Sequence, residues 1–185
     1  ILDKENSFHG SLGGNAVLIP STAPIGPGTS LRMDIRTKGI YKFGTTGLTI
    51  ETEDSGVFPN GELCVSRINY IPTNNFNPDN KPVSSSYWIL NNFGSNLSFT
   101  PFKVLSFDDI GPVRTQTQAS ELNLFKRGPN EDTSTWILAI NGSSLQPGMK
   151  ASAQFTKTKV QESSQLLISK TIGDTMLVAV HNPEQ

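Results

Sequence analysis

The acidic residues near the expected turns are the side chains in this sequence that could carry out acid–base chemistry. Glycoside hydrolysis needs only two carboxyl groups, at a separation that a sequence does not reveal. In turns, however, Asp side chains usually hydrogen-bond their own backbone. We therefore expect most of these carboxylates to be solvated turn residues, with catalysis as an alternative. The candidates are Glu51, Glu53, Asp54, Glu62, Asp108, Asp109, Glu131 and Asp132.

Four of these acids also suit calcium, which binds several oxygen ligands at once. Asp108 and Asp109 form one turn, and Glu131 and Asp132 lie in another loop. The loops of β-sandwiches commonly offer such oxygen atoms. We therefore take these four residues as candidate calcium ligands, and we expect no other cofactor.

Other catalytic arrangements are missing from the sequence. The two histidines, His9 and His181, lie in the terminal segments, and no HExxH motif occurs. There is no Gly-x-Ser-x-Gly elbow and no phosphate-binding Gly-Lys-Ser/Thr loop. The single cysteine, Cys64, excludes an internal disulfide and a Cys-rich metal site, and its neighbours Leu63 and Val65 predict a buried side chain. The sequence therefore predicts that the protein is not an enzyme.

Aromatic side chains are the second feature that could bind a ligand, because exposed rings stack on sugars and nearby amides bond the hydroxyl groups. Trp88 and Trp136 lie within apolar strands, so we expect both in the core. Tyr87 points away from Trp88 and is expected at the surface. Phe76, in an Asn-rich loop, either anchors that loop or contacts a partner. The candidate ligand-binding residues are Tyr87, Phe76, Tyr70 and Asn91.

The pattern of apolar residues predicts short strands. Strict alternation in Leu31 to Arg36 places Leu31, Met33 and Ile35 on an inner face. Residues 86–96 hold the densest run of aromatic and β-branched side chains, closed by Asn, Gly and Ser, and predict a central strand followed by a turn. Residues 122–127 and 135–140 are expected to pair with each other. Two Asn-Gly pairs, at 60–61 and 141–142, predict type I′ hairpin turns.

Together these segments predict an all-β protein, an antiparallel β-sandwich of jelly-roll or immunoglobulin-like type with about twelve short strands and little or no helix. A chain of 185 residues with 16 Gly and 12 Pro fits many strands joined by turns. We expect a loose lead-in at residues 1–15, a single sandwich domain at 16–180 and a tail at 181–185. Both ends are expected to be cut from a longer protein.

The charge balance of the chain is nearly neutral, with 15 basic and 16 acidic residues. Nucleic acids and anionic membrane surfaces attract proteins through excess positive charge, so neither is an expected partner. The chain also has no apolar run long enough to insert across a bilayer. The expected partners are therefore a glycan or neighbouring protein modules.

One part of the sequence resembles a known kind of module. The motifs are 87–94 (Tyr-Trp-Ile-Leu-Asn-Asn-Phe-Gly), 124–128 (Leu-Phe-Lys-Arg-Gly), 130–132, 135–136 and 154–155. They look like a β-sandwich module of very large, secreted, multidomain surface proteins of Bacteroidetes-type bacteria. The resemblance is best across residues 87–155. It implies an extracellular or cell-surface location, and it carries no catalytic residues.

The sequence therefore leads us to expect a non-catalytic extracellular β-sandwich module for adhesion or carbohydrate binding within a larger secreted or cell-surface protein. One alternative is a structural spacer without a ligand. Another is a jelly-roll carbohydrate-active enzyme that uses two of the carboxylates, and viral or phage surface domains share the same architecture. A shallow groove with exposed Tyr and Phe would favour binding, a convex polar surface the spacer, and two facing carboxylates in a cleft the enzyme.

Overall fold

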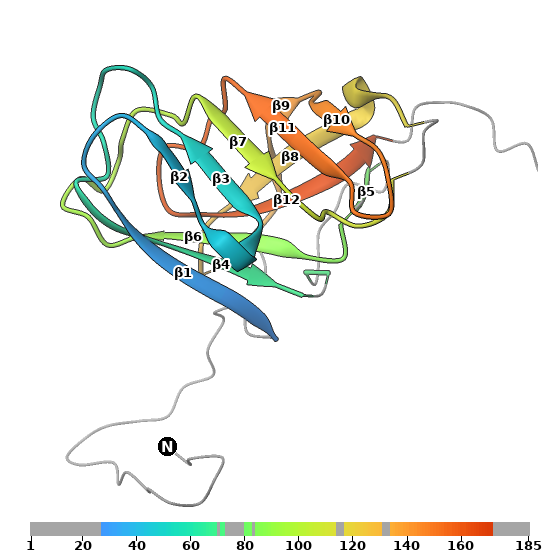
Figure 1. Ribbon diagram of the computed structural model, residues 1–185, viewed down its shortest axis with the longest axis horizontal. Helices are drawn as coiled ribbons and strands as arrows, with labels where there is room; N and C mark the ends of the chain where they lie inside the picture. The colour runs from blue at the N-terminus through green and yellow to red at the C-terminus, as the bar shows by residue number, and fades with distance from the viewer. Residues whose placement is uncertain are drawn as a thin grey trace, which may run out of the picture.

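The protein is a sandwich of two antiparallel β-sheets. The computed structural model describes residues 27–69, 71–72, 80–82, 84–113, 117–130 and 134–171. Within these residues, twelve strands form the two sheets, which face each other (Figure 1), and two short 3-10 turns are the helical elements. These turns are η1 (Gly44–Thr46) and η2 (Ala119–Glu121). The predicted all-β sandwich of about twelve short strands is therefore confirmed.

The larger sheet has seven strands, and the stretch expected to be central lies in its middle. The sheet order is β1-β4-β6-β12-β8-β9, and the short β5 also pairs with β12. The expected pairing of segments 122–127 and 135–140 is present as β8 and β9, with a bulge between Leu124 and Phe125. The strands are β1 (Gly28–Ile35), β4 (Gly61–Ile68), β5 (Asn80–Pro82), β6 (Tyr87–Asn92), β8 (Leu122–Arg127), β9 (Ile137–Asn141) and β12 (Ser164–Thr171).

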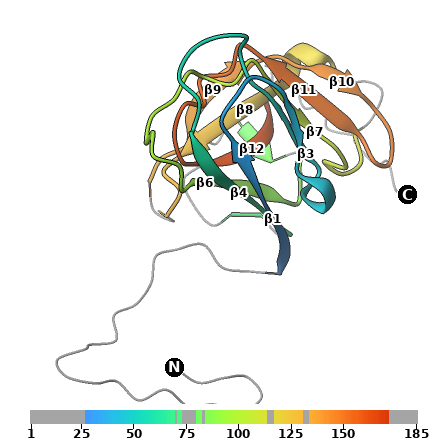
Figure 2. The same cartoon turned by 60° about the vertical axis from the view of Figure 1, so that its left-hand side comes forward.

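The smaller sheet has five strands in the order β10-β11-β7-β3-β2. Figure 2 shows β1, β4 and β6 of the larger sheet on the side of the molecule away from β10 and β11. The strands of the smaller sheet are β2 (Ile40–Lys42), β3 (Leu48–Glu51), β7 (Val104–Phe107), β10 (Ser144–Gln146) and β11 (Ser152–Thr156).

The main core fills the space between the sheets, and Trp88 lies within it. Trp88 on β6 is fully buried, and its ring meets the Phe107 ring of β7 edge to face at 4.8 Å between centroids. The Trp88 Nε1–H donates a 2.7 Å hydrogen bond to the backbone oxygen of Thr46 in η1. Aromatic pairs of this geometry contribute beyond their buried area. Trp88 of the larger sheet thus contacts both η1 and β7 across the core.

A second hydrophobic cluster lies on the outer face of the seven-stranded sheet. Along β6, Tyr87 and Ile89 alternate with Trp88 and Leu90, so they point to the opposite face. All four are nevertheless buried, because the outer face is covered as well. The expectation of an exposed Tyr87 is therefore wrong: its side chain is 2% exposed. The cluster contains Ile68, Tyr87, Ile89, Phe125, Trp136 and Leu167.

The two Asn-Gly hairpin predictions are also wrong. Residues 57–60 form no strand, and the chain enters β4 at Gly61, whose φ of 154° lets it lie against the backbone of Gly94. After Asn141, the chain leaves β9 for β10, which belongs to the other sheet. Gly142, with a φ of 75°, makes that change of direction. Asn60-Gly61 thus allows a close approach of two backbone segments, and Asn141-Gly142 allows the chain to pass from one sheet to the other. The local sequence does not distinguish these roles from a hairpin turn.

The inward alternation of β1 is only partly confirmed. Ile35 is fully buried and Met33 is partly buried, but Leu31 is 39% exposed. β1 is an edge strand of its sheet, and the residues of its first half are exposed rather than packed against the core. The predicted core positions of Trp88 and Trp136 are confirmed, and so is the burial of Cys64.

The backbone at Gly94 lies so close to Pro59 that this position requires glycine, and the requirement can be tested. A Cβ at Gly94 would overlap the carbonyl oxygen of Pro59, whereas a Cβ at Gly39 would make ordinary contacts with the Tyr41 ring. We expect Gly94→Ala to lower the free energy of unfolding by about 2 kcal/mol, as overpacking does, and Gly39→Ala to change it far less. Chemical denaturation of both variants measures this difference. Equal effects of the two substitutions would show that the loops do not meet as described.

Candidate ligand-binding groove

A polar groove lies on the outer face of the five-stranded sheet, toward its β10 edge. One row of side chains runs across all five strands, because their registers align Ser144, Gln154, Ser106, Thr49 and Lys42 as successive cross-strand neighbours. The groove lies at the β10-β11-β7 end of this row and has a volume of about 240 Å³. Its lining consists of Ser106, Asp108, Ser144, Gln146, Ser152, Ala153 and Gln154.

Alternation within β7 and β11 creates this polar face. In β11, Ala153 and Phe155 are buried, while Gln154 between them is exposed. In β7, Ser106 stands between the buried Leu105 and Phe107. The inner side chains therefore fix both strands to the core, and the outer face is left with small hydroxyl and amide groups.

Most of the polar groups in the groove keep free hydrogen-bonding capacity. Gln154 Nε2 donates a 3.2 Å hydrogen bond to Ser106 Oγ. The side chains of Ser144, Gln146 and Ser152 make no hydrogen bond within the described part of the chain. An amide and a hydroxyl each offer both donors and acceptors. The groove thus presents neutral groups suited to a ligand rich in hydroxyl groups.

Of the two candidate calcium ligands that the structure describes, Asp108 lies in this groove and Asp109 does not. The Asp108 carboxylate follows β7 and is exposed, and the backbone N–H of this residue donates to the Gly47 carbonyl at 2.8 Å. Asp109 adopts a φ of 55°, and its backbone oxygen accepts a 2.8 Å hydrogen bond from Arg67 Nη2. Glu131 and Asp132 lie outside the described residues. Among the residues that are described, no three His, Cys, Asp or Glu side chains gather as a metal site would require, so calcium remains a prediction.

Of the four residues expected to bind sugar, the two that the structure describes, Tyr87 and Asn91, do not line the groove. Tyr87 is buried in the outer cluster of the seven-stranded sheet, because β6 is covered on both faces. Asn91 is half-buried on that same sheet, opposite Cys64 of β4. Tyr70 and Phe76 lie outside the described residues. Sequence reasoning missed Ser106, Gln154 and the other groove residues, because alternation marks them as outward-facing but only the strand order brings them together.

A second cavity, of about 280 Å³, lies beside β2 and β3 and contains two of the candidate carboxylates. Glu51 forms a 2.8 Å ion pair with Lys103, and Asp54 lies 3.9 Å from Lys38. The hydrogen bond to Glu51, and then its charge, raise the pKa of Lys103 above the ordinary value of 10.5, with a smaller effect of the Asp54 charge. Both carboxylates are thus already paired with ammonium groups.

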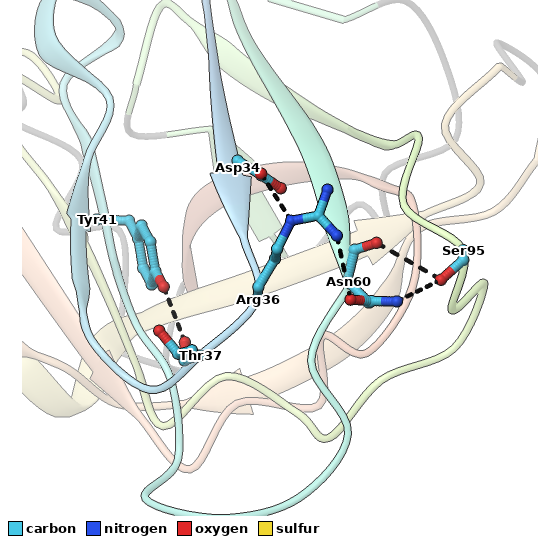
Figure 3. A network of polar contacts seen from close by, with 6 residues as sticks. All are labelled: Asp34, Arg36, Thr37, Tyr41, Asn60 and Ser95. Carbon is cyan, nitrogen blue, oxygen red and sulfur yellow. Dashed lines mark hydrogen bonds and ion pairs between the residues drawn. The ribbon is translucent and has the colours of Figure 1, made fainter.

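A network of polar contacts joins the loops at one end of the sandwich (Figure 3). Arg36 donates to Asp34 at 2.8 Å and to the side-chain oxygen of Asn60 at 3.4 Å, and Asn60 Nδ2 donates to Ser95 Oγ at 2.7 Å. Phe93, two residues before Ser95, is 62% exposed, and Arg32 lies 5.5 Å from the centre of its ring. It is the exposed aromatic side chain in the described part of the chain. The network ties loops together and leaves little free polar capacity for a ligand.

Comparison of the chain with protein-family models, with curated proteins and with solved structures gave no match. The resemblance to bacterial surface modules therefore remains a prediction. In the described residues, no helix is long and apolar enough to span a membrane.

The ion pair beside the second cavity leads to a prediction about pH. Replacing Glu51 with Gln should lower the pKa of Lys103 toward 10.5, and Asp54→Asn should lower it less, because the Glu51 contribution is the largest. The folded pKa is raised, so the pair stabilises the fold below pH 10.5 and its contribution is lost as the pH rises through the raised value.

Titration of the Lys103 side-chain resonances by NMR measures the two pKa changes. In denaturation experiments, the stability difference between the native protein and Glu51→Gln should shrink above pH 10.5. A larger effect of Asp54→Asn than of Glu51→Gln would contradict the geometry given above.

Proposed function

We propose that this chain is a non-catalytic, extracellular β-sandwich module that binds carbohydrate within a larger secreted or cell-surface protein. The observation that carries the proposal is the groove on the five-stranded sheet, in which hydroxyl and amide groups from three strands converge. Sugar hydroxyls are recognised by a few such polar groups placed on a rigid scaffold. The extracellular location rests on the resemblance of residues 87–155 to secreted surface modules.

The size of the groove favours a short stretch of glycan and modest affinity. At about 240 Å³ it is smaller than most small-molecule pockets, which span about 300–1,000 Å³. It is also open, so a bound sugar would keep part of its surface in water. Such a site suits adhesion through many copies, in which weak contacts add up to strong attachment.

The arrangement of carboxylates favours binding over catalysis. A glycosidase needs two carboxyl groups on either side of the bond to be cleaved, and Asp108 is the only one in the described lining of the groove. The second cavity has both Glu51 and Asp54, but lysine partners hold both of them.

The structural spacer remains the second candidate, and one observation favours it. The described lining of the groove contains no aromatic ring, although such rings usually supply the apolar contact for a pyranose. The spacer and the binding module differ in one respect that an experiment can detect, since only the binding module retains a glycan.

We predict that the isolated chain retains at least one glycan on an array and that the groove is responsible. Gln154→Ala and Ser106→Ala should each weaken binding about five- to tenfold, the effect of losing one hydrogen bond of roughly 1 kcal/mol. Gln161→Ala, at an exposed glutamine outside the groove, should leave binding unchanged. Arrays with calcium and with EDTA, together with Asp108→Asn, show whether the groove also uses a metal.

A blank array with a chain that melts cooperatively would favour the spacer instead. Equal losses for Gln154→Ala and Gln161→Ala would contradict the location of the site, although not carbohydrate binding itself.

A further inference from the structure

The edges of the two sheets differ greatly in length. Within the described residues, the strands with a neighbour on one side only are β1, β9, β2, β10 and the three-residue β5, which pairs with β12 alone. β2 and β10 have three residues each and β9 has five, whereas β1 has eight. Natural proteins keep open edges short or interrupt them, because a long edge offers unpaired backbone groups to another strand. β1, the blue strand along the lower edge of the ribbon in Figure 1, departs from that pattern.

The backbone of β1 alternates between its neighbour β4 and the open edge. The carbonyl of Pro27 accepts from Asn69, and that of Ile35 accepts from Asn60, so both of these carbonyls point toward β4. In an antiparallel pair, alternate residues point their N–H and C=O groups to the same side. The backbone groups of Ser30, Arg32 and Asp34 therefore point to the open edge.

The charges along this open edge have opposite signs and stand two residues apart. Arg32 and Asp34 lie on the outer face, with side chains 62% and 56% exposed. Asp34 stands directly opposite Glu62 of β4, which places two carboxylates next to each other. Arg32 bonds Glu62 and Arg36 bonds Asp34, each at 2.8 Å. These four charges balance within one chain, and a cation opposite Asp34 on the open-edge side would give that carboxylate a second partner.

We propose that β1 pairs antiparallel with β1 of a second copy of this chain, about a two-fold axis at Met33. This register sets Arg32 opposite Asp34 of the second copy, and Asp34 opposite Arg32 of the second copy. Both pairs join residues whose backbone groups point to the open edge, so the hydrogen-bond pattern and the charges agree. The two seven-stranded sheets then form one continuous sheet, and the row across the joint becomes Glu62, Asp34 and Arg32 of the second copy.

Neighbouring registers are disfavoured by the same charges. An axis at Arg32 sets two Arg32 side chains opposite each other, and an axis at Asp34 does the same for two Asp34 carboxylates. Like charges directly opposite destabilise a strand pair. Of the axes at Arg32, Met33 and Asp34, only the axis at Met33 sets unlike charges of β1 opposite each other.

β9, at the other edge of the sheet, has no comparable pattern of alternating charges. Its residues, Ile137–Asn141, carry no charge, and the bulge in its pairing with β8 interrupts the regular ladder. Bulges of this kind protect an edge from further pairing. An apolar edge without charges would also leave the register of any pairing unspecified.

The first experiment measures self-association by sedimentation equilibrium. In the proposed register, residues 31–35 of β1 pair with the same five residues of the second copy, which is a small interface, so we expect a dimer with a dissociation constant of roughly 10–100 µM. Arg32→Asp and Asp34→Arg should each weaken it about tenfold or more, because each creates two like-charge pairs. The double variant Arg32→Asp/Asp34→Arg restores both unlike pairs and should dimerise as the native chain does. Lys150→Asp, an exposed charge change in the β10–β11 turn, serves as the control.

The second experiment tests the register. In a Cys64→Ala background, Met33→Cys should form a disulfide-linked dimer on oxidation, since residues on the axis come within disulfide distance. Leu31→Cys should not, because its opposite residue is Ile35 of the second copy. Thermal melts establish that each variant is folded. A monomer at all concentrations, a dimer insensitive to both charge reversals, or crosslinking through Leu31→Cys in place of Met33→Cys would overturn the proposal.

Discussion

The hydrogen bond and ring contact of Trp88 hold the two sheets together, and the remaining structure depends on them. Its indole joins the middle of the seven-stranded sheet to η1 and to Phe107 on β7. Arg67, the cross-strand neighbour of Trp88, lies 5.5 Å from the ring and donates to the turn after β7. A sandwich without disulfides relies on such interior contacts for the relative position of its sheets. The position of β7 fixes that of the groove, because Ser106 lies beside Phe107 on the same strand.

The two outer faces of the sandwich differ in polarity and burial. The middle of the seven-stranded sheet is buried on both sides, with Trp88 of β6 on the inner face and Tyr87 on the outer one. The five-stranded sheet is buried on one side only, and its outer face carries a row of polar side chains. The proposed binding groove lies on the five-stranded sheet, whereas the proposed association uses β1 of the seven-stranded sheet. The two proposed functions therefore use different strands.

Local features of the fold could be predicted from the sequence, and features that depend on distant pairing could not. Residues 122–127 and 135–140 pair as expected because only a short loop separates them. Asn60-Gly61 has the composition of a hairpin turn, but contact with Gly94 determines its conformation. Alternation separated Tyr87 from Trp88 correctly, yet it carries no information on whether the second face is covered. Ser106 and Gln154, 48 residues apart, meet only because β7 pairs with β11.

The most direct test of this account is hydrogen exchange at the Trp88 indole Nε1–H, followed by NMR at increasing denaturant concentration. If Trp88 fixes one sheet to the other, its indole hydrogen exchanges only when the whole domain unfolds. Its exchange free energy and its dependence on denaturant should then equal those of global unfolding. Exchange through a local opening, with a lower free energy and little dependence on denaturant, would contradict the central role given to this side chain.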